Sequence, residues 1–461
     1  MSADLSKAVP AVPQPAPNPY DPNHPADEPL SAPPPLLRTR LAAMMFLQYA
    51  SLGLWSVTFG TFVGANTGKQ GAGIFSESFV GDAASAGALG AIFAPLAIGW
   101  LADRWLASER MLCVLHAACA AILLAIAQQQ TQIGFYFGLL AYYQCYVPTV
   151  TLSNSLSMQQ LTNTAADFPP IRAVGTSGWI AAGLLIGWLW PTVFGAEIES
   201  LRTPMLVAVG AHVAQSLYCL TLPHTPPAHR VQRQIAQLAQ GGGLVRRKEI
   251  VTFIVLSMLA CMGAQFYNVL NLFLNQQHIQ YAAAKQSFGQ LTEVVAMVML
   301  PAATAWLGLK RLMLLGVAAW GLRYLMLSGS ASSGSGWLLA PAIALHGVSY
   351  VWVYMSGALF IDRMAGPRAR GAAQGMFALA TLGVGHLCGA LMVGGAQAWL
   401  LTPAGVNPPP YHWEAFWLIP AGLMGVAMVL FALFFSEQPN APTQPKPDAP
   451  VVPRVAEGLE P

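Results

Sequence analysis

The sequence predicts an all-α membrane protein with twelve transmembrane helices in two halves of six. Hydrophobic residues make up 55% of the 461 residues, charged residues make up 9%, and the mean hydropathy is +0.50. A soluble domain carries about 25% charged residues, so the composition excludes an ordinary soluble fold. The apolar residues gather in about twelve segments, and the longest polar break, from His224 to Lys248, divides them six and six.

Each segment can cross the hydrocarbon core of a bilayer, which takes roughly 20 mostly apolar residues. The predicted spans of the first half are 41–65, 80–102, 110–128, 134–157, 170–193 and 204–222. Those of the second half are 250–274, 286–306, 312–329, 337–361, 371–398 and 413–435.

The two ends of the chain differ from the spans in composition. The first 36 residues hold eleven prolines and no apolar core of the kind a secretory signal carries. Proline-rich segments of this kind do not bury enough apolar surface to fold. We therefore expect a disordered cytoplasmic arm (1–36), a six-helix bundle (37–223), a cytoplasmic loop (224–248), a second six-helix bundle (249–436) and a disordered cytoplasmic tail (437–461).

The basic residues between spans predict the orientation. If the N-terminus is cytoplasmic, the cytoplasmic connections hold fourteen Lys and Arg residues, and the opposite face holds only Lys69, Arg202 and Lys285. This bias follows the positive-inside rule. We expect a multi-pass protein of the cytoplasmic (inner) membrane with both termini cytoplasmic.

Short basic turns recur at matching places in the two halves. Gly99-Trp-Leu-Ala-Asp103-Arg104 follows the second span, and Gly308-Leu-Lys310-Arg311 follows the eighth. Such turns are typical of the major facilitator architecture, whose halves rock around a midplane site. Asp103 and Arg104 are interpreted as a conformational latch at the cytoplasmic face.

Glu293 is the only one of the nineteen acidic residues that lies deep inside a predicted span. A carboxylate there is costly, and in membrane proteins such a group usually belongs to a transport pathway or a proton relay. Glu293 is therefore the predicted proton-coupling residue. The alternative is a protonated side chain hydrogen-bonded between helices.

Other polar residues in the spans fall on shared helix faces. One face of the fifth predicted span carries Arg172, Thr176 and Trp179, at positions i, i+4 and i+7. Two further pairs are spaced i, i+3: Gln265 with Asn268 in the seventh span, and Gln290 with Glu293 in the eighth. Together these groups can bind a polar ligand that has an aromatic ring, with Trp179 for stacking and the amides for hydrogen bonds. Arg172 could instead snorkel to the surface, the amides could join helices, and Trp179 could be an ordinary packing aromatic.

Five further cations and histidines lie within predicted spans. Arg323 is interpreted as a structural or interfacial cation. Hydrogen-bonded packing is the favoured role of the histidines, with a proton relay as the alternative; they are His116, His212, His346 and His386. The six cysteines also lie in apolar segments without metal-site spacing, so neither a metal nor a cofactor is expected.

The segment from Asp167 to Trp179 reads Asp-Phe-Pro-Pro-Ile-Arg-Ala-Val-Gly-Thr-Ser-Gly-Trp. It resembles the motif of the nucleoside:proton symporters of the major facilitator superfamily. Shorter similarities are Phe46-Leu-Gln48-Tyr, Tyr146-Val-Pro148-Thr, Thr221-Leu-Pro223-His224 and Gln374-Gly-Met-Phe377. The resemblance runs from about Leu41 to Phe435, and it implies the same twelve-helix fold and proton-driven import of nucleosides.

The resemblance also implies roles for single residues. Arg172, Thr176 and Trp179 would contact the nucleoside, as would the pairs Gln265–Asn268 and Gln290–Glu293. The chain departs from the family at Val351, where the family has an aspartate in the tenth span. We expect Val351 to face the ligand, with weaker recognition of common ribonucleosides, and Val351→Asp to strengthen uridine binding.

The function predicted from the sequence is a secondary transporter that imports nucleosides with protons by alternating access, and we expect it to be a monomer in the bilayer. A transporter of another polar sugar-like or glycosidic solute is the alternative within this class. A polytopic membrane enzyme acting on a lipid or glycan is disfavoured because no connection between spans carries a catalytic set of side chains. A substrate-sensing receptor would need a folded appendage. No nucleic-acid partner is expected.

Overall fold

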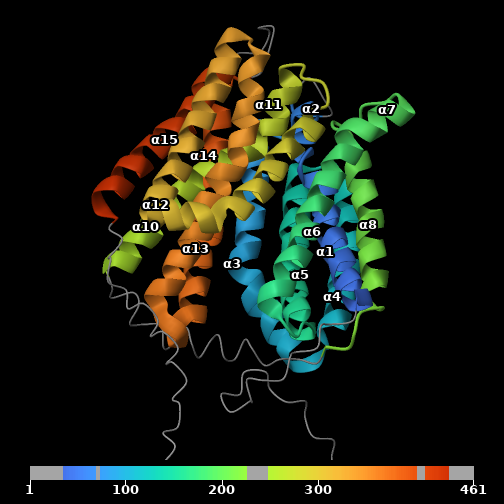
Figure 1. The fold of residues 1–461 in the computed structure, drawn as a ribbon. Coiled ribbons are helices and arrows are strands. Elements are labelled where there is room, and N and C mark those ends of the chain that lie inside the picture. The colour runs from blue at the N-terminus through green and yellow to red at the C-terminus, as the bar shows by residue number, and fades with distance from the viewer. Residues whose placement is uncertain (1–34, 69–72, 226–247, 402–410, 436–461) are drawn as a thin grey trace, which may run out of the picture.

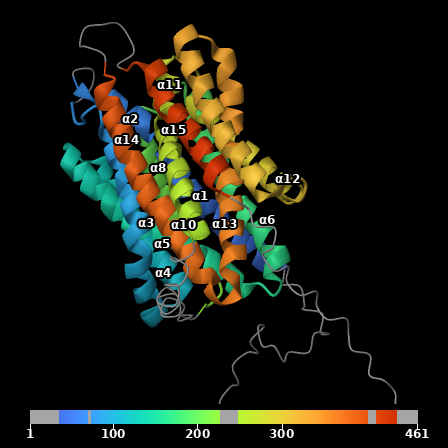
Figure 2. The same cartoon turned by 90° about the vertical axis from the view of Figure 1, so that its left-hand side faces the viewer.

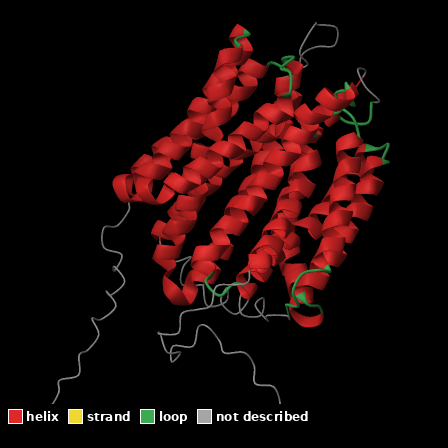
Figure 3. Cartoon of the chain, turned by 45° about the vertical axis from the view of Figure 1, so that its right-hand side comes forward, coloured by secondary structure: helices red, strands yellow, loops and turns green. Residues whose placement is uncertain are grey.

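The computed structural model describes residues 35–68, 73–225, 248–401 and 411–435, with the side chains of 95–105 and 366–372 outside the description. These residues are helical almost throughout (Figure 3). Two isolated bridges, Thr67 to Phe75 and Leu401 to Tyr411, are the only β pairing among them. The predicted disordered arm and tail lie outside the described residues, apart from the start of the first helix.

The first half of the chain builds a group of long helices (Figure 1). Its elements are α1 (Pro35–Ser56), α2 (Phe59–Ala65), α3 (Phe79–Trp105), α4 (Ser108–Ala127), α5 (Gln132–Gln160), α6 (Thr164–Leu184), the π-helix η2 (Leu185–Leu189), α7 (Trp190–Phe194) and α8 (Thr203–Cys219). Side chains cap two of these helices: Thr131 accepts a hydrogen bond from the Gly134 N–H, and Asn163 accepts one from the Ala166 N–H.

The second half builds a corresponding group. Its elements are α10 (Lys248–Ala264), the 3₁₀ helix η4 (Gln265–Val269), α11 (Leu270–Gln276), α12 (Ala282–Ser333), the 3₁₀ helix η5 (Gly336–Leu338), α13 (Leu339–Ala378), the π-helix η6 (Leu379–Gly385), α14 (His386–Trp399) and α15 (Trp413–Phe434). Within α12 the chain turns sharply at Gly308, whose φ of 75° is open to glycine.

Every predicted span overlaps a helix. Eight helical segments among the described residues are long and apolar enough to cross a membrane, and one of them, α12, covers two predicted spans, 286–306 and 312–329. Three further predicted spans correspond to α3, α5 and α8. The all-α membrane fold is therefore as expected, and the exact count of twelve crossings stays a prediction.

Large apolar side chains point outward from these helices. Trp306, Val298 and Leu433 are 83%, 76% and 71% exposed. Exposed apolar surface on this scale is unfavourable in water, whereas it is the surface that lipid requires. The outer surface of the helices is thus that of a multi-pass membrane protein.

The two groups of helices meet along several contacts. Helix α3 packs on α14, α6 packs on α12, and α2 packs on α11 (Figures 1 and 2). Helix α2 also packs on η4, where a Cβ on Gly60 would lie 3.1 Å from the Asn268 carbonyl oxygen. The surface between the halves is therefore the place where a ligand can contact both of them.

A buried carboxylate connects the halves beside α2 and α11. Glu199, in the loop before α8, accepts hydrogen bonds from Asn271 Nδ2 at 3.0 Å, Asn275 Nδ2 at 2.9 Å and the Ala283 N–H at 3.0 Å. Thr61 of α2 donates to Asn271 Oδ1 at 2.5 Å and accepts from Asn275 Nδ2 at 3.1 Å. This cluster, Thr61–Glu199–Asn271–Asn275, closes one end of the interface, and we call it the Glu199 cluster.

Candidate functional site

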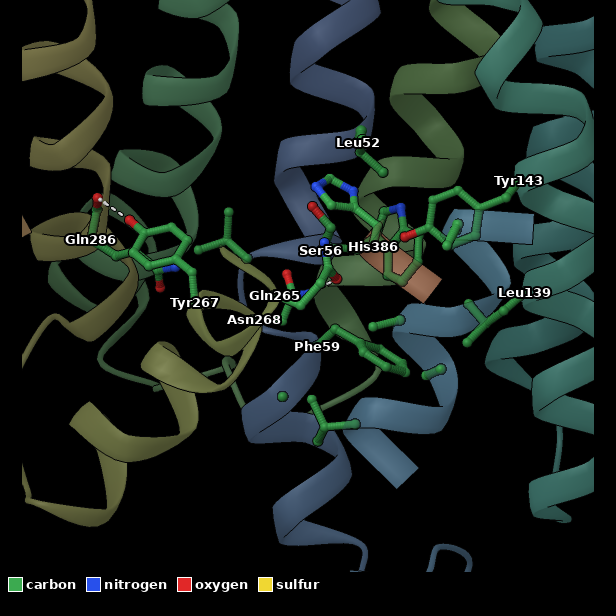
Figure 4. A pocket seen from close by; sticks show the side chains of 18 of the residues that line it. Leu52, Ser56, Phe59, Leu139, Tyr143, Gln265, Tyr267, Asn268, Gln286 and His386 are labelled. Atoms are coloured by element: carbon green, nitrogen blue, oxygen red, sulfur yellow. Dashed lines mark hydrogen bonds between the residues drawn. The ribbon is translucent and has the colours of Figure 1, made fainter. Parts of the chain in front are cut away.

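A cavity of about 240 Å³ lies between the two halves. From the first half it is lined by α1, α2, α3, α5 and α6; from the second half it is lined by η4, α12 and α14 (Figure 4). Its polar and aromatic wall consists of Trp55, Ser56, Phe59, Tyr143, Trp179, Gln265, Tyr267, Asn268, Gln286, Gln290 and His386. A concave site with a few polar groups in an aromatic wall is typical of small-molecule binding.

Gln265 and Asn268 lie together because the seventh predicted span is broken. Helix α10 ends at Ala264 and the chain continues as the 3₁₀ helix η4, in which residues i and i+3 eclipse one another. Asn268 Nδ2 donates to Gln265 Oε1 at 2.8 Å. This leaves the Gln265 Nε2 hydrogens and the Asn268 Oδ1 acceptor for a ligand.

Trp179 reaches the cavity through close packing of α6 on α1. A Cβ on Gly178 would collide with the backbone of Phe46, so glycine is required where the two helices cross. Across the same contact, a Cβ on Gly53 would lie 3.3 Å from the Trp179 ring. The glycines of the motif therefore bring the indole to the cavity wall.

Arg172 and Thr176 lie on the same helix as Trp179 but are not among the cavity-lining residues. The Arg172 guanidinium lies over the Tyr49 ring, with Cζ 4.2 Å from the ring centroid. Arg172 is half-buried and Thr176 is buried. The guanidinium is thus held against α1 by a cation–π contact, which the snorkelling alternative does not predict.

Glu293 is half-buried on α12, where α13 approaches so closely that a Cβ on Gly347 would collide with the Glu293 backbone nitrogen. It lies near enough to Arg172 to interact electrostatically, although no hydrogen bond or ion pair joins these two described side chains. Gln290, which lines the cavity, lies one turn before Glu293 on α12. Arg172 and Glu293 therefore lie beside the cavity without lining it.

Of the seven binding residues predicted from the sequence, the structure brings four to the cavity wall: Trp179, Gln265, Asn268 and Gln290. The side chains of Asp103 and Arg104, the predicted latch, lie outside the described residues. Val351 is fully buried and is not among the cavity-lining residues, so the cavity wall gives no support to the expectation that it faces the ligand.

Several lining residues escaped the sequence analysis. Gln286 precedes Gln290 by four residues, so helical spacing could have indicated it. Tyr267 lies between Gln265 and Asn268, but an aromatic residue in a span carries no signal of its own. Ser56 and Tyr143 belong to spans in which no polar face was apparent.

All four histidines make hydrogen bonds, as the packing interpretation predicts. In the first half Gln48 Nε2 donates to Thr149 Oγ1 at 2.7 Å, so Gln48 Oε1 accepts from His116 Nε2 at 2.9 Å. His116 Nδ1 then accepts from His212 Nδ1 at 3.0 Å, and His212 Nε2 accepts from the Tyr142 hydroxyl at 2.9 Å. Neutral rings satisfy this buried chain completely.

The other two histidines lie in the second half. His346 Nδ1 accepts a hydrogen bond from Arg323 at 3.1 Å. His386 lines the cavity and bonds the Tyr354 hydroxyl through Nε2 at 2.7 Å. Arg323 is fully buried, which makes it a structural cation of the bundle interior and excludes an interfacial position.

The fold and the cavity are those of a multi-pass membrane transporter of major facilitator architecture. The sequence matches the Nucleoside H+ symporter family over residues 36–440. The chain therefore belongs to the nucleoside H+ symporter family.

Individual relatives agree with this assignment. The chain is 32% identical over 417 residues to the putative nucleoside transporter YegT of Escherichia coli (strain K12), covering 89% of this chain and 96% of that protein. It is 28% identical over 427 residues to the nucleoside permease NupG of the same organism, covering 88% and 98%.

Solved structures show the same fold. The crystal structure of nucleoside transporter NupG superposes with a TM-score of 0.75 at 26% identity, covering 87% of this chain and all of that one. A peptide transporter of the POT family shares the fold at 14% identity, with a TM-score of 0.65.

Proposed function

We propose that this chain imports nucleosides together with protons, binding the nucleoside in the cavity between its halves. The residues that line this cavity are the main support for the proposal. An indole from the first half and an amide pair from the second half converge on one space. Stacking on an aromatic ring contributes roughly 1–3 kcal/mol per base, and the free donor and acceptor of the Gln265–Asn268 pair match a nucleobase edge.

Glu293 is the proposed proton-coupling residue. It is the carboxylate that the sequence places deep in a span, and it lies within electrostatic reach of Arg172 on the opposite half. Proton binding at Glu293 would cancel its attraction to Arg172 and so change the interaction between the halves. Arg172 and Thr176 would contact the ligand when the halves close around it.

The remaining assignments complete the proposal. The halves 37–223 and 249–436 would rock about the cavity, with both termini on the cytoplasmic side of a bacterial inner membrane. Asp103 and Arg104 would act as a latch at that side, and the Glu199 cluster would close the other side. The working unit would be a monomer in the lipid bilayer.

Uptake of labelled uridine and adenosine in a transport-deficient host tests the proposal. The expected result is accumulation above the vector control that a protonophore abolishes. Absence of uptake for both nucleosides would overturn the assignment of nucleoside as substrate, and uptake of labelled free sugars would then identify a sugar-like solute. Accumulation that persists with the protonophore would overturn proton coupling.

A further inference from the structure

Tyr267 occupies a particular place in the cavity wall. It lies in the 3₁₀ helix η4 between Gln265 and Asn268, and its hydroxyl donates to the Gln286 carbonyl oxygen at 3.5 Å (Figure 4). The ring lines the cavity from the second half, whereas Trp179 lines it from the first. A flat ligand between the halves can therefore reach an aromatic ring on each side.

Arg323 and His346 lie against the same face of the Tyr267 ring. Arg323 Cζ is 4.1 Å from the ring centroid, and the imidazole of His346 is stacked at 4.4 Å with an interplanar angle of 8°. The guanidinium also donates to His346 Nδ1 at 3.1 Å. If Arg323 and His346 lay on opposite faces of the Tyr267 ring, they would be too far apart to form that hydrogen bond. They therefore share one face of the ring, and the opposite face is left for the cavity.

The arginine of this arrangement is costly to bury. Arg323 is fully buried, its Nε and Nη2 atoms have no hydrogen-bond partner, and no described carboxylate forms an ion pair with it. An arginine side chain does not lose its proton in a protein, so burial cannot be relieved by neutralisation. Its close contacts are His346 and the rings of Tyr267 and Tyr324.

We propose that Tyr267 is a ligand-contacting aromatic that stacks on the nucleobase, and that Arg323 and His346 are the positioning residues that hold it. This inference rests on the proposed function. The cation behind the ring withdraws electron density from it, which favours stacking of an electron-rich base on the free face. Because Trp179 and Tyr267 belong to different halves, a base between them would also join the halves.

The test is a binding measurement on the purified full-length protein with uridine, adenosine and ribose. Tyr267→Phe keeps the ring and is expected to bind both nucleosides within about 3-fold of wild type. Tyr267→Leu removes the stacking face and is expected to weaken nucleoside binding by roughly 10-fold, in line with measured stacking on aromatic side chains. Competition by ribose should be the same in all three proteins.

Arg323→Met tests the positioning role. It is expected to weaken nucleoside binding in the wild-type background and to add little to Tyr267→Leu, because both changes act through the same ring. Tyr324→Leu is the matched control: its ring also lies near Arg323, at 5.8 Å, but it does not line the cavity. Its nucleoside affinity should match wild type.

The outcomes separate the two proposals. Failure of the wild-type protein to bind any nucleoside would overturn the proposed function itself. Wild-type binding together with unchanged affinity in a folded Tyr267→Leu protein would overturn only the role of Tyr267. Equal weakening by Tyr324→Leu and Tyr267→Leu would show that loss of packing, not loss of a contact, causes the effect. If Arg323→Met does not fold, the two Tyr267 variants still test whether Tyr267 contacts the nucleobase.

Discussion

Arg172 and Glu293 lie beside the cavity without lining it, and Tyr49 contacts Arg172. Arg172 is fixed by the Tyr49 ring of α1, and Glu293 is carried by α12 of the other half. The electrostatic interaction between Arg172 and Glu293 therefore crosses the interface between the halves. Interactions across such an interface are the ones that ligand and proton binding can change.

Trp179 is predicted to stack on the base. Trp179→Phe should retain most of the nucleoside affinity, whereas Trp179→Ala should weaken it by roughly 1–3 kcal/mol, the usual contribution of base–aromatic stacking. Titration calorimetry with uridine provides the measurement. An unchanged dissociation constant for Trp179→Ala would assign the indole to packing alone.

Val351 is fully buried on α13 and does not line the cavity, and this determines what its substitution should do. Since the side chain is fully buried away from the cavity lining, Val351→Asp would bury a carboxylate without a partner. Such a charge costs several kcal/mol, so we expect a large drop in Tm and no gain in uridine affinity. Val351→Thr, of similar shape, should cost less. Tighter uridine binding by a stable Val351→Asp protein would contradict this account.

At the scale of helices, hydropathy predicted the spans because lipid requires about 20 apolar residues in every crossing. Spacing along ideal helices also predicted which polar residues share a face, and four of seven reached the cavity wall. The break at η4 was not predictable, because it depends on how the chain packs against α2 and α14. The contact of Arg323 with Tyr267 and His346 was not predictable either, because these residues are distant from Arg323 in the sequence.

The crossing of α1 and α6 depends on Gly178. Gly178→Ala would press a Cβ against the Phe46 backbone, and overpacking of this kind costs about 1–3 kcal/mol. We expect a lower Tm and reduced uridine uptake, because Trp179 and Arg172 move with α6. Gly422→Ala on α15, where the new Cβ meets nothing within 4 Å, is the control. Its Tm should equal or exceed that of wild type; a similar fall in both would contradict the packing argument.

At the scale of the whole molecule, the Glu199 cluster holds the halves together at one end. Glu199→Ala removes the acceptor of the Asn271 amide and of the Ala283 N–H, and a buried polar group left unpaired costs about 1–3 kcal/mol; Asn275 loses one of its acceptors and keeps Thr61. We expect a lower Tm and impaired uptake. Glu197→Ala, two residues away and exposed, should leave both unchanged. Equal stability of the two variants would show that the cluster does not hold the interface.

We propose that Glu293 couples proton movement to nucleoside movement between the two halves. The most direct measurement follows labelled uridine in proteoliposomes, comparing accumulation driven by a pH gradient with exchange at equal pH. Glu293→Gln keeps the shape of the side chain and removes its titration, so it should lose accumulation while retaining exchange; Glu197→Gln should retain both. Accumulation at the wild-type level by Glu293→Gln would contradict the claim.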